Sequence, residues 1–151
     1  MVHCALAHGD KVIATMRKPS AAADIVAQYP SSQLIVVELD VAKPEQIKPA
    51  FQAGKTAFGR IDVVFNNAGF AVGGEVETVP EDISRAVFEV NFWGAVHVAQ
   101  EALRFFREEN VPRGGHLIQN SAACGVVGVP LLGIYSATKH GKRNCSSSAK
   151  Q

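Results

Sequence analysis

The sequence predicts an α/β fold in which helices cover both faces of a parallel sheet. Short apolar runs without polar alternation, such as Leu34–Val37, are typical of strands that are buried on both faces, as they are in parallel sheets. Longer segments between these runs carry apolar residues every three or four positions, which is the period of a helix face. This alternation of strands and helices predicts right-handed crossovers and a doubly wound sheet.

The first half of the chain contains three predicted strands with two helices between them. The strands are expected at residues 12–16, 34–37 and 61–65. Ser20 is the expected N-cap of the first helix, which ends at Tyr29-Pro30. The second helix has apolar positions at steps of 4, 3 and 4, namely Ile47, Phe51, Gly54 and Phe58. Pro49 lies inside this segment and counts against a regular helix there.

The longest helix is predicted from about Pro80 to Glu109, and it has two apolar faces. One face consists of Ile83, Val87, Val90, Gly94, Val98, Ala102 and Phe105. The other consists of Phe88, Phe92, Ala95, Ala99, Leu103 and Phe106. Because a helix that is apolar on two sides has to be covered on two sides, one face is expected on the sheet. The other face needs a second helix layer or another subunit, unless the two faces form one wide stripe without a partner.

The last predicted elements are a fourth strand and a final helix. His116–Ile118 follows the Gly114-Gly115 turn as a strand. A loop with several glycines then leads to a helix that starts near Tyr135.

Composition and charge exclude several classes of function. The chain has 151 residues, and 15 Lys and Arg against 14 Asp and Glu leave a net charge of +1, so no nucleic-acid partner is expected. No apolar run approaches the roughly 18 residues of a membrane helix, and no secretory signal is visible, so we expect a cytoplasmic chain without a membrane partner. The 3 cysteines are widely spaced, and no metal-ligand spacing of Cys or His occurs, so no metal site is expected.

The segment from Tyr135 to Lys139 contains the first chemical signal. The two residues are four apart and therefore share a helix face. A phenol with a pKa of about 10 is a poor acid–base catalyst at neutral pH. A neighbouring lysine cation should lower that pKa, which suits proton exchange with a hydroxyl or carbonyl oxygen. By itself, such a pair is most often a solvated helix face.

Further polar residues stand where strands end. Asn66-Asn67-Ala68-Gly69 closes one apolar strand, and Asp40-Val41 ends the preceding one. Doubly wound sheets bind ligands beyond the carboxyl ends of their strands. Asn91 lies between the two apolar faces of the long helix, where it must be exposed or satisfied by a buried partner.

Taken together and in this order, these segments resemble the short-chain dehydrogenase/reductase family over roughly residues 9–141. The matching pieces are Asp40-Val41, Asn66-Asn67-Ala68-Gly69, Val90–Gly94 and Tyr135–Lys139. The resemblance implies a Rossmann-like fold and an NAD(P)(H)-dependent oxidoreductase that acts on a small alcohol or carbonyl substrate. It also implies that intact relatives are homo-oligomers, because the long helix of this family pairs across a subunit interface.

The same resemblance implies a role for each matching residue. Tyr135 would be the catalytic acid/base, Lys139 would lower its pKa and hold the nicotinamide ribose, and Asn91 would anchor a water in a proton relay. The cofactor would also meet Asp40 and Val41 beside the adenine, and Asn67, Ala68 and Gly69 along the cleft.

The end of the first strand bears on the choice of cofactor. NAD-binding members tend to place an acid there to accept a hydrogen bond from the ribose 2′-hydroxyl. Here the stretch is Ala14–Lys18, without an acid, and Arg17 and Lys18 could pair with a 2′-phosphate. NADP is therefore expected in preference to NAD, and the alternative is that both cations are ordinary surface residues.

The sequence departs from the family at its start and at the catalytic serine. The family opens with a strand and a glycine-rich turn that holds the pyrophosphate, whereas residues 1–10 resemble the end of the helix after that turn. The serine is expected thirteen residues before the tyrosine, at Ala122, and Ser121 stands one position away. A slip of one residue on an extended segment turns the side chain around, unless a local bulge brings Ser121 into place.

The third departure is the end of the chain. We expect a partial NAD(P)-binding domain at residues 1–141, without the first strand and the C-terminal strands, and a disordered tail unrelated to the family at 142–151. Strong activity is not expected from such a chain. The alternative is a non-catalytic fragment or pseudoenzyme that pairs with intact subunits through its long helix. A flavodoxin-like binding module is a third reading, and it predicts an acidic or phosphate-binding pocket instead. The family reading requires Tyr135, Lys139 and Asn91 to converge on one cleft.

Overall fold

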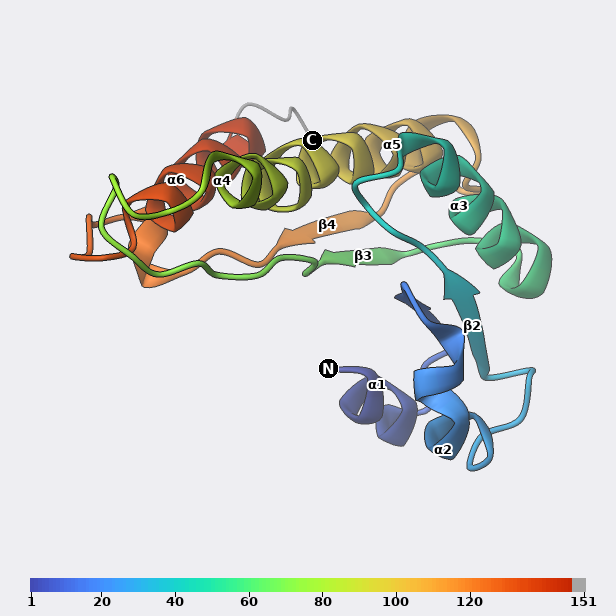
Figure 1. Ribbon diagram of the computed structural model, residues 1–151. Helices are drawn as coiled ribbons and strands as arrows, with labels where there is room; N and C mark the ends of the chain where they lie inside the picture. Colours follow the sequence, from blue (N-terminus) through green and yellow to red (C-terminus); the bar gives the residue numbers. More distant parts are fainter. Residues whose placement is uncertain (148–151) are drawn as a thin grey trace.

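The computed structural model describes residues 1–147, and the strands in this part of the chain form two parallel pairs. β1 (Val12–Met16) pairs with β2 (Leu34–Glu38), and β3 (Val63–Asn66) pairs with β4 (His116–Gln119). Both ladders are parallel, and the first two strands begin where the sequence predicts them. Over residues 1–147, no ladder joins β1 to β3, and Figure 1 shows two separate pairs.

The helices of the first half are shorter or longer than predicted. α1 (Val2–His8) ends at Gly9, whose positive φ of 91° suits a glycine at a helix C-terminus. α3 (Pro44–Phe58) runs for 15 residues and accommodates Pro49 inside its first turns. Between β1 and β2 lie only η1 (Pro19–Ala22) and α2 (Ala23–Val26). The predicted cap at Ser20 is wrong, because Pro19 already starts the first turn and no side-chain cap forms there.

The predicted long helix is present as three consecutive segments. α4 (Glu81–Phe88) continues through the π-helical segment η2 (Glu89–Gly94) into α5 (Ala95–Glu108). The sequence does not reveal the π-helical turn, which is a feature often found at functional sites. Gly94 lets this segment approach the chain just after β2, because a Cβ at this glycine would lie 2.8 Å from the Val41 side chain.

The main core lies between α3, α5 and the strands. Its buried members are Leu39, Val41, Ile47, Ala50, Phe51, Ile61, Val98, Ala102, Phe105 and Phe106. A smaller cluster of Leu6, Ala14 and Leu34 joins α1 to β1 and β2. On the first apolar face of the long helix Ile83 is exposed and Val90 half-buried, and the other members are buried. The second face is buried at Ala95 and Phe106 and half-buried at Phe92. Both faces are thus covered in large part within this one chain.

The last helix corrects the predicted tail. η3 (Ala123–Gly125) leads into α6 (Gly133–Ser147), which lies beside α4 in Figure 1. Residues 142–147 are therefore helical, and the predicted disorder from residue 142 is wrong over this stretch. Lys142 is only 2% exposed, so burial against neighbouring elements holds the helix there despite its polar sequence. Residues 148–151, also assigned to the predicted tail, lie outside the described residues.

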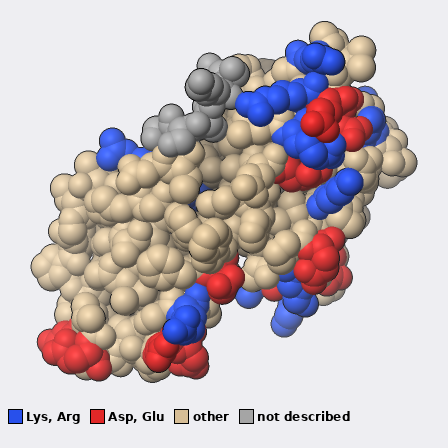
Figure 2. All heavy atoms as spheres, turned by 90° about the horizontal axis from the view of Figure 1, so that it is seen from above, with Lys and Arg blue, Asp and Glu red and all other residues tan. Residues whose placement is uncertain are grey.

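The architecture confirms the predicted α/β class with parallel strands. In Figure 1, α4, α5 and α6 form a layer on one side of β3 and β4, α3 packs beside α5 and β2, and α1 and α2 accompany β1 and β2. Figure 2 shows many of the charged side chains at the end of the molecule where α3 lies, and a broad uncharged area on the side where α6 lies. Among residues 1–147, no helix has both the length and the apolar character that crossing a membrane requires.

Candidate active site

Tyr135 and Lys139 lie one turn apart in the first half of α6, as their spacing predicts. The Lys139 ammonium nitrogen stands 5.6 Å from the centre of the Tyr135 ring. Lys139 is 4% exposed, and its Nζ donates a hydrogen bond of 3.3 Å to the backbone carbonyl of Asn120, just beyond β4. The tyrosine ring is half-buried. The pair therefore sits against the carboxyl ends of the strands and is not a solvated helix face.

The electrostatics of this pair differ from the prediction. Burial, with a smaller contribution from the Cys124 thiol, raises the pKa of Tyr135. Burial likewise lowers the pKa of Lys139. The predicted lowering of the phenol pKa is wrong for this structure, because removal from water disfavours both the phenolate and the ammonium.

Asn91 is fully buried in the π-helical segment and holds the turn after β3. Its Oδ1 accepts a hydrogen bond of 2.9 Å from the Phe70 amide, and its Nδ2 donates to the Phe70 carbonyl at 2.8 Å. The same Nδ2 donates to the Thr138 hydroxyl at 3.1 Å, and that hydroxyl donates to the Tyr135 carbonyl at 2.7 Å. Asn91 thus connects the turn after β3 to the helix that carries Tyr135 and Lys139.

Gly69 brings the turn after β3 against two of the predicted site residues. A Cβ at Gly69 would lie 2.8 Å from Asn91 Oδ1 and 3.6 Å from Lys139 Nζ. Glycine is therefore needed for the main chain to pass this closely. Farther back in the turn, Asn67 Oδ1 accepts a hydrogen bond of 2.7 Å from Asn120 Nδ2, which links the ends of β3 and β4. Ala68 packs against the main core from the same turn.

The two serine alternatives lie on an extended segment after β4. Ala122 has φ −154° and ψ 163°, so the side chains of residues 121 and 122 point in opposite directions. Ser121 is exposed, and its Oγ lies 2.9 Å from the place that a Cβ at Gly125 would take. Within residues 1–147, no hydrogen bond joins the Ser121 hydroxyl to Tyr135. The structure therefore brings together Tyr135, Lys139 and Asn91, and Ser121 lies beside Gly125.

The predicted adenine-side residues lie at the ends of β1 and β2. Met16, Arg17, Lys18 and Ala21 line a recess of about 500 Å³ at the end of β1. Asp40 is held in a local turn, because its Oδ1 accepts a hydrogen bond of 3.1 Å from the Ala42 amide. Val41 is 8% exposed and packs on Gly94.

Sequence reasoning missed three residues of this site. Thr138 bridges Asn91 and α6, and Asn120 joins the ends of β3 and β4. The third residue is Lys142, whose Nζ donates a hydrogen bond of 2.9 Å to the Asn66 carbonyl. The four-residue period of a helix that begins near Tyr135 places Thr138 and Lys142 on one face, and this was the signal available for both. In the part of the chain that the structure describes, no group of three or more His, Cys, Asp or Glu side chains could hold a metal ion.

Comparisons with known proteins show which family this fold belongs to. A family model described as short chain dehydrogenase matches residues 1–151. Oxidoreductase BOA17 of Botryotinia fuckeliana is 37% identical over 139 residues, which are 92% of this chain and 50% of the relative. The crystal structure of a short-chain dehydrogenase from Streptomyces avermitilis aligns with a TM-score of 0.87 at 32% identity and covers 96% of this chain and 53% of that one.

Two other solved structures carry cofactors. A short-chain dehydrogenase/reductase from Burkholderia phymatum in complex with NAD aligns with a TM-score of 0.79 at 26% identity, over 91% of this chain and 49% of that one. ElxO with NADP bound aligns with a TM-score of 0.81 at 25% identity, over 93% of this chain and 57% of that one. The chain spans about half the length of the curated relatives that it matches. With its α/β fold and its match to the family model over its whole length, the chain belongs to the short-chain dehydrogenase family of oxidoreductases.

Proposed function

We propose that this chain carries the catalytic tyrosine, lysine and asparagine of an NADP-dependent oxidoreductase that interconverts an alcohol and a carbonyl compound. The observation that carries the proposal is the convergence of Lys139 and Asn91 on Gly69, with Tyr135 on the same helix as Lys139. A third side chain, Thr138, links Asn91 to that helix through hydrogen bonds. A flavodoxin-like binding module has no need for this arrangement.

The residues present fit a dinucleotide. Gly69 gives close access to the main chain beside the Lys139 ammonium, and Arg17 and Lys18 supply cations at the recess beyond β1. When bound, the nicotinamide supplies the hydride. Lys139 would donate hydrogen bonds to ribose hydroxyls, and the Tyr135 hydroxyl would give its proton to the carbonyl oxygen of the substrate or take one back.

The water that Asn91 would anchor has a restricted set of partners. Both hydrogens of the Asn91 amide are used, one on the Phe70 carbonyl and one on the Thr138 hydroxyl. Oδ1 keeps one lone pair beyond its bond with the Phe70 amide. We therefore assign the proposed water to this lone pair or to a carbonyl of the π-helical segment.

Replacing Tyr135 with Phe should lower any NADPH-dependent reduction of ketones by this chain by about 10²–10⁴-fold, the usual value of a positioned acid or base. The change removes the hydroxyl but keeps the half-buried ring. Loss of NADPH absorbance at 340 nm measures the rate. Tyr29→Phe is the matched control, because Tyr29 packs in the small cluster around α1. Undiminished reduction by Tyr135→Phe would exclude Tyr135 as the acid.

The preference for NADP makes a separate prediction. We propose that Arg17 pairs with the 2′-phosphate in the recess at the end of β1. A hydrogen bond to a charged group contributes about 1.5–3 kcal/mol, so Arg17→Ala should weaken NADPH binding by about tenfold or more. NADH has no 2′-phosphate and should bind the variant and the parent equally. Fluorescence titration with both nucleotides tests this, and equal losses for NADPH and NADH would show that Arg17 does not read the phosphate.

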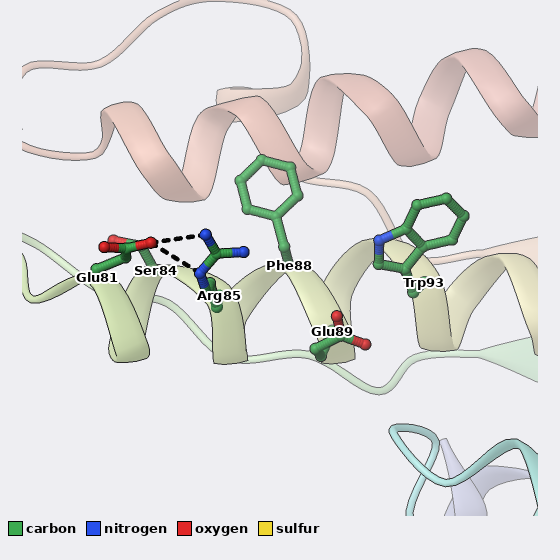
Figure 3. A pocket seen from close by; sticks show the side chains of 6 residues that line it. All are labelled: Glu81, Ser84, Arg85, Phe88, Glu89 and Trp93. Atoms are coloured by element: carbon green, nitrogen blue, oxygen red, sulfur yellow. Dashed lines mark hydrogen bonds and ion pairs between the residues drawn. The ribbon is translucent and has the colours of Figure 1, made fainter.

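We also propose a second role, pairing with another subunit through the long helix. Ile83 and Trp93 are 40% and 47% exposed on this helix, so its apolar residues are not fully covered. Figure 3 shows Phe88 and Trp93 projecting toward α6, with the Glu81–Arg85 ion pair at one end of the hollow. The hollow has a volume of about 360 Å³ and is lined by side chains of α4 and η2, none of which is a predicted catalytic residue. This location favours a packing surface over a second catalytic site.

A further inference from the structure

Lys142 is a buried cation directly behind the candidate active site. It is 2% exposed, whereas lysines rarely lie fully inside a protein without a specific reason. It stands three residues after Lys139 on α6, and its Nζ donates to the carbonyl of Asn66, the last residue of β3. The Asn66 carbonyl also accepts the Asn120 amide at 3.2 Å. One carbonyl thus receives hydrogen bonds from α6 and from the chain beyond β4.

The two lysines donate hydrogen bonds to backbone carbonyls at the ends of neighbouring strands. Lys142 holds the end of β3 through Asn66, and Lys139 holds the Asn120 carbonyl one residue beyond β4. Asn66 is itself fixed to α5, because its Nδ2 donates to the Ala95 carbonyl at 2.9 Å in the buried interior. The position of α6 over the strand ends therefore depends on both ammonium groups, of which only Lys139 has a place in the proposed reaction.

We propose that Lys142 is a positioning residue for this site: its ammonium group fastens α6 to the carboxyl end of β3 and so holds Lys139 in place beside Gly69. The inference rests on the proposed function, since it gives Lys139 the task of binding the cofactor. Lys142 itself touches neither substrate nor cofactor in this scheme. Its contribution is made through Lys139 and Tyr135, which share its helix.

The surroundings of Lys142 shift its pKa, and this shift predicts a pH dependence of stability that can be measured. Burial, together with the charge of Lys139, lowers the pKa of Lys142 from 10.5 to about 8. The residues at the strand ends are the uncharged amides Asn66, Gln119 and Asn120, and Glu89 of the neighbouring π-helical segment is exposed. Between these two pH values the unfolded chain binds more protons than the folded chain. The free energy of unfolding should therefore rise as the pH is raised across this window.

The test compares Lys142→Met and Lys142→Gln with the unchanged chain. Methionine keeps the length of the stem but removes the donor and the charge, whereas glutamine keeps an N–H donor without the charge. We expect Lys142→Met to weaken NADPH binding about tenfold, the effect of losing one charged hydrogen bond. Lys142→Gln should stay within about threefold of the unchanged chain. Lys48→Met, on the exposed side of α3, is the matched control.

Two readouts do not need the cofactor. In a chain with ¹³C-labelled lysine, the carbon resonances report the pH at which each lysine titrates. Lys139 and Lys142 should have titration midpoints different from those of the other lysines, and Lys142→Met should raise the titration midpoint of Lys139. Lys142→Met should also remain folded and lose the rise in urea midpoint between about pH 8 and pH 10, because a buried charge replaced by an apolar group of similar volume is commonly neutral or stabilising. Because loss of the charge alone also raises the titration midpoint of Lys139, Lys142→Gln, which loses the charge but keeps a donor, is the comparison for it.

The outcomes separate this inference from the proposed function. Failure of the unchanged chain to bind NADPH would count against the proposed function, while the Lys139 titration would still decide the role of Lys142. An unchanged Lys139 midpoint in Lys142→Met would overturn the inference. Equal NADPH affinity of Lys142→Met and the unchanged chain would also overturn it. The same holds if Lys142→Met and Lys142→Gln lose equal NADPH affinity, because the hydrogen bond to Asn66 would then have no positioning effect.

Discussion

Adding a strand and a glycine-rich turn before Met1 should raise the affinity of this chain for NADPH by about 100-fold or more, the effect of about 2.8 kcal/mol. The chain contains no G-x-G-x-x-G motif. Such a turn binds a pyrophosphate through backbone amides and a helix N-terminus, which together favour negative charge. α1 packs on β1 through Leu6, so a strand joined to the start of α1 is held next to β1.

The arrangement of the two strand pairs supports this prediction. β1 and β3 are joined by no ladder, so each has an edge whose N–H and C=O groups can pair with an added strand (Figure 1). A right-handed connection from that strand through α1 to β1 is the one that parallel sheets use. Fluorescence titration of both chains with NADPH measures the gain. In the matched control, valines replace the turn glycines, which keeps the strand but blocks close approach of the phosphates. Equal affinity with and without the extension would contradict the argument.

The elements that the sequence predicted well are those set by local pattern. The unalternating apolar run at residues 34–37 and the short run at 12–16 coincide with β2 and β1, although only Leu34 and Ala14 are fully buried in these strands. The long helix was found for a similar reason, since its two apolar stripes extend over many turns. α2 shows the limit of such patterns: it has four residues, and the 3₁₀ turn η1 before it begins at Pro19 and has no cap from Ser20.

The parts that the sequence did not reveal depend on contacts between distant segments. The π-helical turn at Glu89–Gly94 accompanies the contact between Asn91 and Phe70, which are 21 positions apart. Lys142 looked like part of a polar tail, because charge and serine content predict exposure and the carbonyl of Asn66 lies 76 positions away. Local composition carries no information about such a partner.

The candidate site shows the same division. Tyr135 and Lys139 were found from their spacing within one helix, and Asn66–Gly69 from its place at the end of a strand. The sign of the Tyr135 pKa shift was not found, because it follows from burial of the ring and not from the lysine alone. Residue type and spacing therefore identify the chemical groups, and the packing around them determines the direction in which their pKa values shift.

Replacing Ala122 with Ser should raise the rate of carbonyl reduction by about 10²–10³-fold, which is the usual effect of one hydrogen-bond donor to the reacting oxygen. The family resemblance expects a serine thirteen residues before Tyr135, and that position is Ala122. The backbone at Ala122 is extended, so a serine there points opposite to Ser121. Because a rate of chemistry requires bound cofactor, single-turnover reduction is best measured at saturating NADPH in the chain with the added strand and turn.

Ser121 provides the matched comparison, because it carries the same hydroxyl one position away. Its exposed side chain faces Gly125, and among the described residues it makes no hydrogen bond to Tyr135. If Ala122 occupies the serine position, Ser121→Ala should leave the rate unchanged, and Ala122→Ser should gain activity with or without Ser121. If a local shift of the backbone lets Ser121 act in its place, Ser121→Ala should lose about 10²–10³-fold and Ala122→Ser should gain little. The two variants thus assign the hydrogen-bond donor to one position, because an extended backbone cannot direct both side chains to the same oxygen.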